Sequence, residues 1–262
     1  MNLKLSVTLG LALAIALGPG MVRAQKRRDA PKNFNIVFIG NSITHGAGLK
    51  DPATEAPPAE AVIWLKKQKG IGKIDFRNMG ISGRTTVDFL PGGPKCFQQV
   101  EEAANSFTDK QAQLVFSIIL GTNDSAVKGP NGAPVAVVDY SANLRKIADK
   151  LLEEFPGCKI IFQQPIWYSK NTHNRSTYDA EGLERLQTYF PAIKRVVRSY
   201  RDSIPGRVFM GDTRAYGFFR KHAEDNFQHE NGAEGVFFLH PNKEGAVILG
   251  DFWAKAIYKK LQ

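Results

Sequence analysis

The chain has few residues that could form cross-links or metal sites. Of its 262 residues, two are cysteine and five are histidine. Cys96 and Cys158 permit one disulfide in an oxidising compartment, and two isolated thiols are an equally good interpretation. Neither cysteine has a histidine or second cysteine nearby at metal-ligand spacing. Four histidines also show no ligand pattern: His45, His173, His222 and His229. The sequence therefore predicts no metal and no other cofactor.

Several common motifs are absent as well. The sequence contains no G-x-S-x-G elbow, no phosphate-binding G-x-x-x-x-G-K-[ST] and no H-E-x-x-H, so ordinary α/β-hydrolase, nucleotide-binding and zinc-protease functions lose support. The formal charge is +10, but its cations are scattered and are not interleaved with stacking aromatics. A solvated basic surface is expected, without nucleic-acid binding.

The first 24 residues have the pattern of an export signal. One cation, Lys4, precedes an apolar run from Leu5 to Leu17, and Gly18-Pro19-Gly20 then breaks the helix. Val22-Arg23-Ala24 supplies small residues at the cleavage positions. The run is shorter than the ~20 residues that span a bilayer, so no stable membrane anchor is expected. We predict removal of residues 1–24 and a secreted or periplasmic location; losing Lys4 and Arg23 lowers the charge from +10 to +8.

The remaining residues, 25–262, alternate apolar runs with helical patterns, which predicts one α/β domain with helices on both faces of a mostly parallel sheet. Strands are expected at Ile36–Ile39, Ile74–Met79, Leu114–Leu120, Lys159–Phe162 and Val208–Met210. Helices are expected at Glu60–Gln68, Tyr140–Phe155, Ala180–Arg201 and Glu244–Leu261. Pro191 should start, kink or break the third helix.

Reactive groups follow the predicted strands. Ser42 comes after the first strand, Gly83 after the second and Asn123 after the third, and His240 precedes the last helix. Each alone has an ordinary structural role, as an N-cap, a turn residue, an Asx-turn former or a packing residue. Ligands bind where parallel strands end, and together these residues supply a nucleophile, oxyanion donors and a base. The combination favours acyl transfer.

In this order, the four segments resemble the conserved blocks of the SGNH, or GDSL, hydrolase family. Gly121-Thr122-Asn123-Asp124 and His240-Pro241-Asn242 are the most specific matches. The resemblance implies a three-layer α/β/α flavodoxin-like fold with a five-stranded sheet, Ser42 as nucleophile and His240 as base. It also implies an oxyanion hole made by Ser42, Gly83 and Asn123, and ester hydrolysis without a metal.

The sequence departs from the family pattern at two positions. Asn41 stands where an aspartate usually precedes the serine, with little consequence because that residue is not the triad acid. Phe237 occupies the usual position of the acid, three residues before His240. Glu234, Asp225 or a backbone carbonyl could orient the imidazole instead. We predict a Ser-His dyad whose ring is oriented by a main-chain carbonyl or water.

The expected substrate is a small-molecule or glycan ester, with O-acetyl groups on carbohydrates favoured. Three loop aromatics suit sugar stacking, although each also suits packing: Trp167, Tyr168 and Tyr178. The alternatives are a lysophospholipase or thioesterase, which needs a long apolar acyl channel, and a non-catalytic glycan-binding protein on the same scaffold. The sequence specifies neither the sugar nor the oligomeric state.

Overall fold

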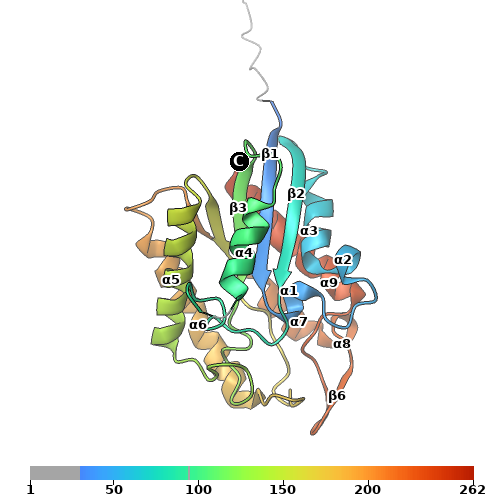
Figure 1. Ribbon diagram of the computed structural model, residues 1–262. Helices are drawn as coiled ribbons and strands as arrows, with labels where there is room; N and C mark the ends of the chain where they lie inside the picture. The colour runs from blue at the N-terminus through green and yellow to red at the C-terminus, as the bar shows by residue number, and fades with distance from the viewer. Residues whose placement is uncertain (1–29, 94) are drawn as a thin grey trace, which may run out of the picture. The chain divides into compact units, whose positions relative to one another are not determined.

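Five parallel strands form the central sheet of the protein, whose computed structural model describes residues 30–93 and 95–262 (Figure 1). The strands are β1 (Lys32–Gly40), β2 (Ile71–Gly80), β3 (Gln113–Ile119), β4 (Lys159–Phe162) and β5 (Val208–Met210). Their order is β2-β1-β3-β4-β5, and each neighbouring pair is parallel. This confirms the predicted fold class. The proposed signal peptide lies outside the described residues.

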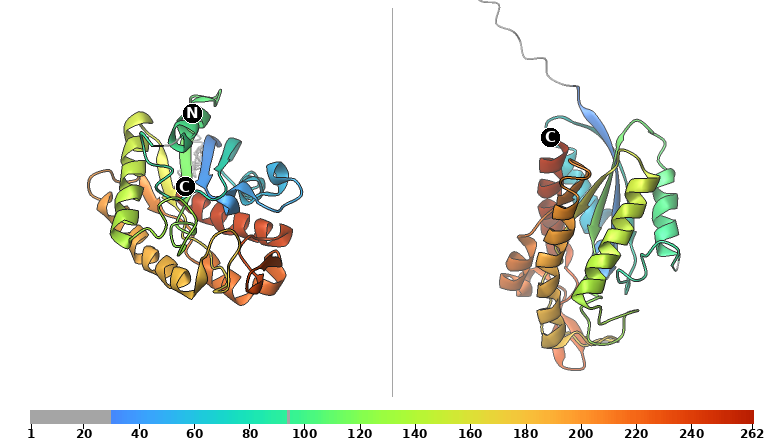
Figure 2. Two further views of the ribbon diagram at one scale, coloured as in Figure 1. Left: turned by 60° about the horizontal axis from the view of Figure 1, so that its bottom comes forward. Right: turned by 90° about the vertical axis from the view of Figure 1, so that its left-hand side faces the viewer.

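Alternating side chains of the strands build a hydrophobic core on each face of the sheet. On β1, Phe34, Ile36 and Phe38 belong to the core shared with α3 (Pro57–Leu65) and α9 (Lys243–Leu261). Val37 and Ile39 point the other way, into the core shared with α4 (Cys96–Asn105), α5 (Val137–Glu154) and α6 (Asp179–Ser199). This period of two is what a strand buried on both faces requires. Figure 2 (right) shows α4 and α5 on one side of the sheet and α9 on the other.

The predicted long helices are all present, with shifted ends. Pro191 lies inside α6, which continues from Asp179 to Ser199. The proline is on the exposed side of the helix, where water can replace the missing backbone hydrogen bond. The sequence did not predict α4, nor the short helices α1 (Ser42–His45), α2 (Pro52–Glu55), α7 (Ala215–Lys221) and α8 (Ala223–Asn226).

Both cysteines are free, buried thiols. Cys96 begins α4, and Cys158 precedes β4 and donates to the Leu151 carbonyl. Burial raises the pKa of each thiol. Of the two possibilities that the sequence leaves open, the structure has the unpaired one.

A small antiparallel hairpin lies beyond the carboxyl end of the main sheet (Figure 1). It consists of β6 (Glu230–Gly232) and β7 (Gly235–Phe237). Residues 31–262 form one compact unit, and no helix within the described residues is long and apolar enough to span a membrane. The hairpin is therefore an appendage of the same unit, placed where the strand-end loops converge.

Candidate active site

Ser42 is the first residue of α1 and lies two residues beyond the end of β1. Asn41 is the N-cap of this helix, and its side chain accepts a hydrogen bond from the Ile43 amide at 3.0 Å. The cap is therefore supplied by the residue before the serine, which leaves the Ser42 hydroxyl available. The backbone of α1 also lies very close to β2, since a Cβ added to Gly80 would lie 2.2 Å from the His45 nitrogen. Only glycine allows this approach.

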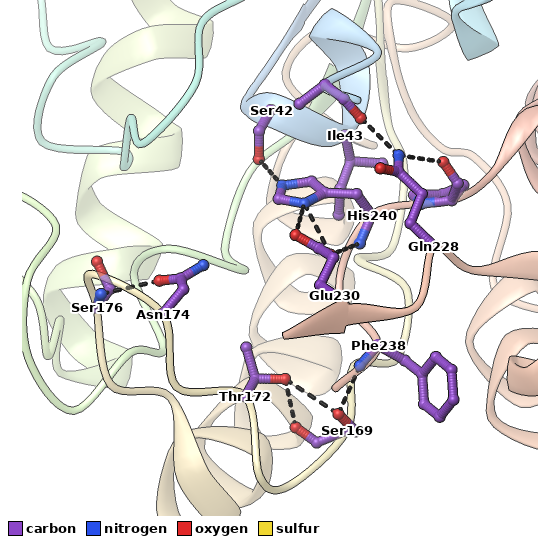
Figure 3. A network of polar contacts seen from close by, with 12 residues as sticks. Ser42, Ile43, Ser169, Thr172, Asn174, Ser176, Gln228, Glu230, Phe238 and His240 are labelled. Atoms are coloured by element: carbon purple, nitrogen blue, oxygen red, sulfur yellow. Dashed lines mark hydrogen bonds and ion pairs between the residues drawn. The ribbon is translucent and has the colours of Figure 1, made fainter. Parts of the chain in front are cut away.

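The Ser42 hydroxyl lies against the imidazole of His240. The distance from Ser42 Oγ to His240 Nε2 is 2.8 Å (Figure 3). The two residues are 198 positions apart in the sequence, and the fold brings them together. A neutral imidazole at this distance can accept the serine proton, which is the geometry that activates a nucleophilic hydroxyl.

The other ring nitrogen of His240 faces a carboxylate. Glu230 places Oε2 at 2.9 Å and Oε1 at 3.0 Å from Nδ1, and Oε1 also accepts the His240 backbone amide at 3.1 Å (Figure 3). The prediction that a main-chain carbonyl or water orients the ring is therefore wrong. Neither acid named from the sequence is at this position, since Asp225 is exposed on α8 and the Glu234 carboxylate lies 4.0 Å from His173 Nδ1.

The hairpin explains how Glu230 replaces the missing acid. Glu230 on β6 is the cross-strand partner of Phe237 on β7, and opposite residues of an antiparallel pair project from the same face. The carboxylate thus comes from the strand facing the usual acid position, while Phe237 itself is 1% exposed and belongs to the core. Only the pairing register relates Glu230 to His240, so spacing along the sequence could not identify it.

Gln228 joins the segment that carries Ser42 to the segment that carries His240. Its side-chain amide donates to the Ala47 carbonyl at 2.7 Å and to the Pro241 carbonyl at 3.0 Å. Its backbone amide donates to the His240 carbonyl at 2.9 Å. Gln228 therefore acts as a bridge that fixes the relative position of the two segments, and the sequence contained no signal for it.

Two of the three proposed oxyanion donors, Gly83 and Asn123, lie on adjoining loops. Gly83 is exposed in the loop after β2 and has φ of 77°, a conformation that glycine adopts without strain. Asn123 follows β3 and is 2% exposed. Its side-chain amide donates one hydrogen bond to the Arg84 carbonyl at 2.8 Å, and the Tyr178 hydroxyl donates to its Oδ1 at 2.7 Å. These contacts fix the amide and tie it to the Gly83 loop, with its second proton still available as a donor.

A buried carboxylate joins the same two loops more deeply. Asp124 is 0% exposed and accepts from both the backbone amide and the hydroxyl of Thr86. Asn143 on α5 donates to that hydroxyl at 3.0 Å. Burial raises the pKa of Asp124 to about 6. Through these buried hydrogen bonds, Asp124 joins the loop that carries Asn123 to the loop that carries Gly83.

Two of the three aromatics suggested for sugar stacking are core residues. Tyr168 is 0% exposed and Tyr178 is 4% exposed, and both belong to the core between the sheet and α5 and α6. Trp167 packs edge-on against Phe227. The stacking hypothesis is therefore wrong for the two tyrosines, whose rings no ligand can reach. Tyr178 instead contributes through its hydroxyl, whose pKa burial raises, so that it remains a hydrogen-bond donor to Asn123.

At the carboxyl end of the parallel sheet, the serine contacts the imidazole and the imidazole contacts the carboxylate. This is the geometry of a serine-dependent acyl-transfer enzyme. Residues 38–248 match the family model described as GDSL-like lipase/acylhydrolase. The chain belongs to this family and is a carboxylic ester hydrolase. No curated protein matches the chain.

Solved structures of esterases share the fold at low sequence identity. A carbohydrate acetylesterase from Sinorhizobium meliloti is 16% identical, with 86% of this chain and 98% of that chain covered and a TM-score of 0.56. An acetyl xylan esterase variant from Geobacillus stearothermophilus is 19% identical, with 88% and 96% covered and a TM-score of 0.57. A lipase/acylhydrolase from Enterococcus faecalis is 18% identical, with 86% and 96% covered and a TM-score of 0.57. At these identities the likeness establishes the fold.

Proposed function

We propose that this protein is an exported serine esterase that removes small acyl groups, chiefly O-acetyl groups, from carbohydrates. The observation that carries the proposal is the continuous contact from Ser42 through His240 to Glu230. The side chains of His240 and Glu230 are 14% and 22% exposed, so these three residues are accessible to a substrate yet partly shielded from water. This triad takes the place of the dyad expected from the sequence.

The proposed reaction begins when Ser42 Oγ attacks the ester carbonyl and passes its proton to His240 Nε2. Glu230 stabilises the resulting imidazolium through Nδ1, while the amides of Ser42, Gly83 and Asn123 stabilise the oxyanion. His240 then protonates the departing alcohol. A water molecule then attacks the acyl-enzyme and passes a proton to His240. The imidazole returns this proton to Ser42 Oγ as the carboxylic acid leaves.

Several observations support an acetylated glycan as substrate. Two structural neighbours are a carbohydrate acetylesterase and an acetyl xylan esterase. The basic charge favours acidic-glycan surroundings through weak steering. Export rests on the pattern of residues 1–24.

Turnover of p-nitrophenyl esters of increasing chain length, followed by acetate release from acetylated xylan, pectin and sialic acids, tests the proposal. We expect faster hydrolysis of p-nitrophenyl acetate than of p-nitrophenyl octanoate, and acetate release from at least one glycan. Ser42→Ala should abolish both reactions. Ser203→Ala is the control, because Ser203 is exposed in the segment before β5, at the opposite end of the sheet.

Each part of the proposal has its own contradicting result. Undiminished turnover by Ser42→Ala would reject the site. A preference for octanoate would reject the small-acyl specificity and favour the lysophospholipase or thioesterase alternative. Turnover of p-nitrophenyl acetate without acetate release from any of the glycans would reject the carbohydrate substrate.

A further inference from the structure

A second cluster of polar side chains lies next to the hairpin that carries Glu230. It contains His173 from the loop after β4, Asp179 from the first turn of α6, and Glu234 from the turn between β6 and β7. One ligand atom from each residue lies within 4.8 Å of the other two. None of these residues contacts Ser42, His240 or Glu230 in the network described above, so the cluster is separate from the proposed active site.

Two atoms of this cluster have no hydrogen-bond partner among the described residues although both are buried. They are Nδ1 of His173 and Oδ1 of Asp179. Burying a polar atom without a partner is unfavourable, so two such atoms within one cluster indicate a missing partner. Glu234 Oε1 lies 4.0 Å from His173 Nδ1. A closer contact between that pair would satisfy the imidazole, but it would leave the Asp179 carboxylate oxygen without a donor.

A single cation would satisfy all three groups. One imidazole nitrogen with two carboxylate oxygens is a donor set that suits Zn²⁺, whereas Ca²⁺ and Mg²⁺ favour oxygen ligands alone. Ligands of a tetrahedral zinc lie roughly 3.3–3.6 Å apart, since each lies about 2.0–2.2 Å from the metal. Glu234, whose side chain is 57% exposed on a turn, has the freedom to close the remaining distance.

Surrounding contacts join the His173 loop to the hairpin independently of any ion. The Ala233 amide donates to the His173 carbonyl at 3.0 Å, and Asn171 donates to the Val236 carbonyl at 2.8 Å. The remaining ring nitrogen of His173, Nε2, is 3.1 Å from the Thr177 hydroxyl. A partner on the second ring nitrogen is typical of metal-binding histidines, because it fixes the ring and its tautomer.

We propose that His173, Asp179 and Glu234 form a binding site for one Zn²⁺ ion that clamps the β6–β7 hairpin to the loop after β4 and the start of α6. Glu234 is four residues from Glu230, so the ion stabilises the hairpin from which Glu230 reaches His240. Spacing along the sequence predicts no such site, because the three ligands come together only through the hairpin and the loop.

Calorimetric titration of ZnCl₂ into the chelator-treated protein, prepared without a histidine tag, tests this proposal. We expect one Zn²⁺ per chain. Loss of a residue that hydrogen-bonds to a metal ligand typically weakens metal binding 10–100-fold, so loss of a ligand itself in His173→Ala or Glu234→Gln should weaken it at least ~100-fold. Glu224→Gln is the matched control, since Glu224 pairs with His229 at 3.7 Å outside the cluster. Glu234 is exposed, so Glu234→Gln tests the site even where His173→Ala fails to fold.

Amide hydrogen exchange of residues 230–237 gives a second readout, which does not depend on enzymatic activity. Zn²⁺ should slow exchange there in the wild-type protein and not in Glu234→Gln. No binding at millimolar ZnCl₂ would overturn the proposal. So would binding of equal strength in Glu234→Gln, which would place the ion elsewhere. Binding that leaves exchange of the hairpin unchanged would overturn its role as a clamp.

Discussion

Replacing Glu230 with glutamine tests the correction from dyad to triad. The carboxylate lies 2.9 Å from His240 Nδ1, and both side chains are less than a quarter exposed. Two unit charges at this distance, in a medium with an effective dielectric constant of about 20, attract by roughly 6 kcal/mol. At 1.36 kcal/mol per decade, this corresponds to an upper limit of about 10⁴ on the contribution of the charge to the rate.

Glutamine keeps an oxygen that can accept from Nδ1 but loses the charge that stabilises the imidazolium. We therefore expect kcat/KM of Glu230→Gln to fall about 10²–10⁴-fold, mainly through kcat. Initial rates on p-nitrophenyl acetate, with circular dichroism to confirm folding, measure this. Asp225→Asn is the control and should lose less than about tenfold, because Asp225 is exposed on α8. If the kcat/KM of a folded Glu230→Gln variant also falls less than tenfold, Glu230 does not contribute to catalysis and the enzyme works with a Ser-His dyad.

Three further predictions concern residues around the triad. Asn123→Ala should lower kcat about 10²–10³-fold with little change in KM, because the amide stabilises charge that develops in the transition state; a raised KM at unchanged kcat would make it a substrate-binding residue. Gln228→Ala removes two hydrogen bonds to backbone carbonyls and should lower the free energy of unfolding by about 1–3 kcal/mol. Urea titration measures this, and unchanged stability would show that the bridge is dispensable. Burial raises the pKa of Asp124 to about 6, so the folded state binds this proton more tightly than the unfolded state. Asp124 therefore makes stability fall as pH rises from about 4 to about 6, by roughly 3 kcal/mol. Asp124→Asn should flatten this dependence in unfolding experiments at pH 4 to 7, and an unchanged slope would contradict the assignment.

The sequence predicted the sheet well because each buried strand is a short apolar run with clear ends. The Phe155-Pro156-Gly157 turn, for example, separates α5 from β4, whose bounds match the prediction. Helix α4 was missed because its ten residues give only a short amphipathic pattern. The hairpin was missed because each of its strands has only three residues.

The same difference applies to the candidate site, where residues that follow long strands were predicted and the residue on the short hairpin was not. Ser42, Gly83, Asn123 and His240 could be found because strand ends converge, so position along the chain indicates position in space. Glu230 depends on the register of a short hairpin, and the sequence does not specify that register. Aromatic character alone likewise did not show that the tyrosines suggested for sugar stacking are core residues.

Labelling with a serine-directed fluorophosphonate, followed by mass spectrometry of the modified peptide, tests the central claim most directly. The claim is that Ser42 is a nucleophile activated by His240 at 2.8 Å. We predict one label per chain on Ser42, no label in Ser42→Ala, and strongly slowed labelling in His240→Ala. A label on a different serine, with Ser42→Ala still hydrolysing p-nitrophenyl acetate, would contradict the claim.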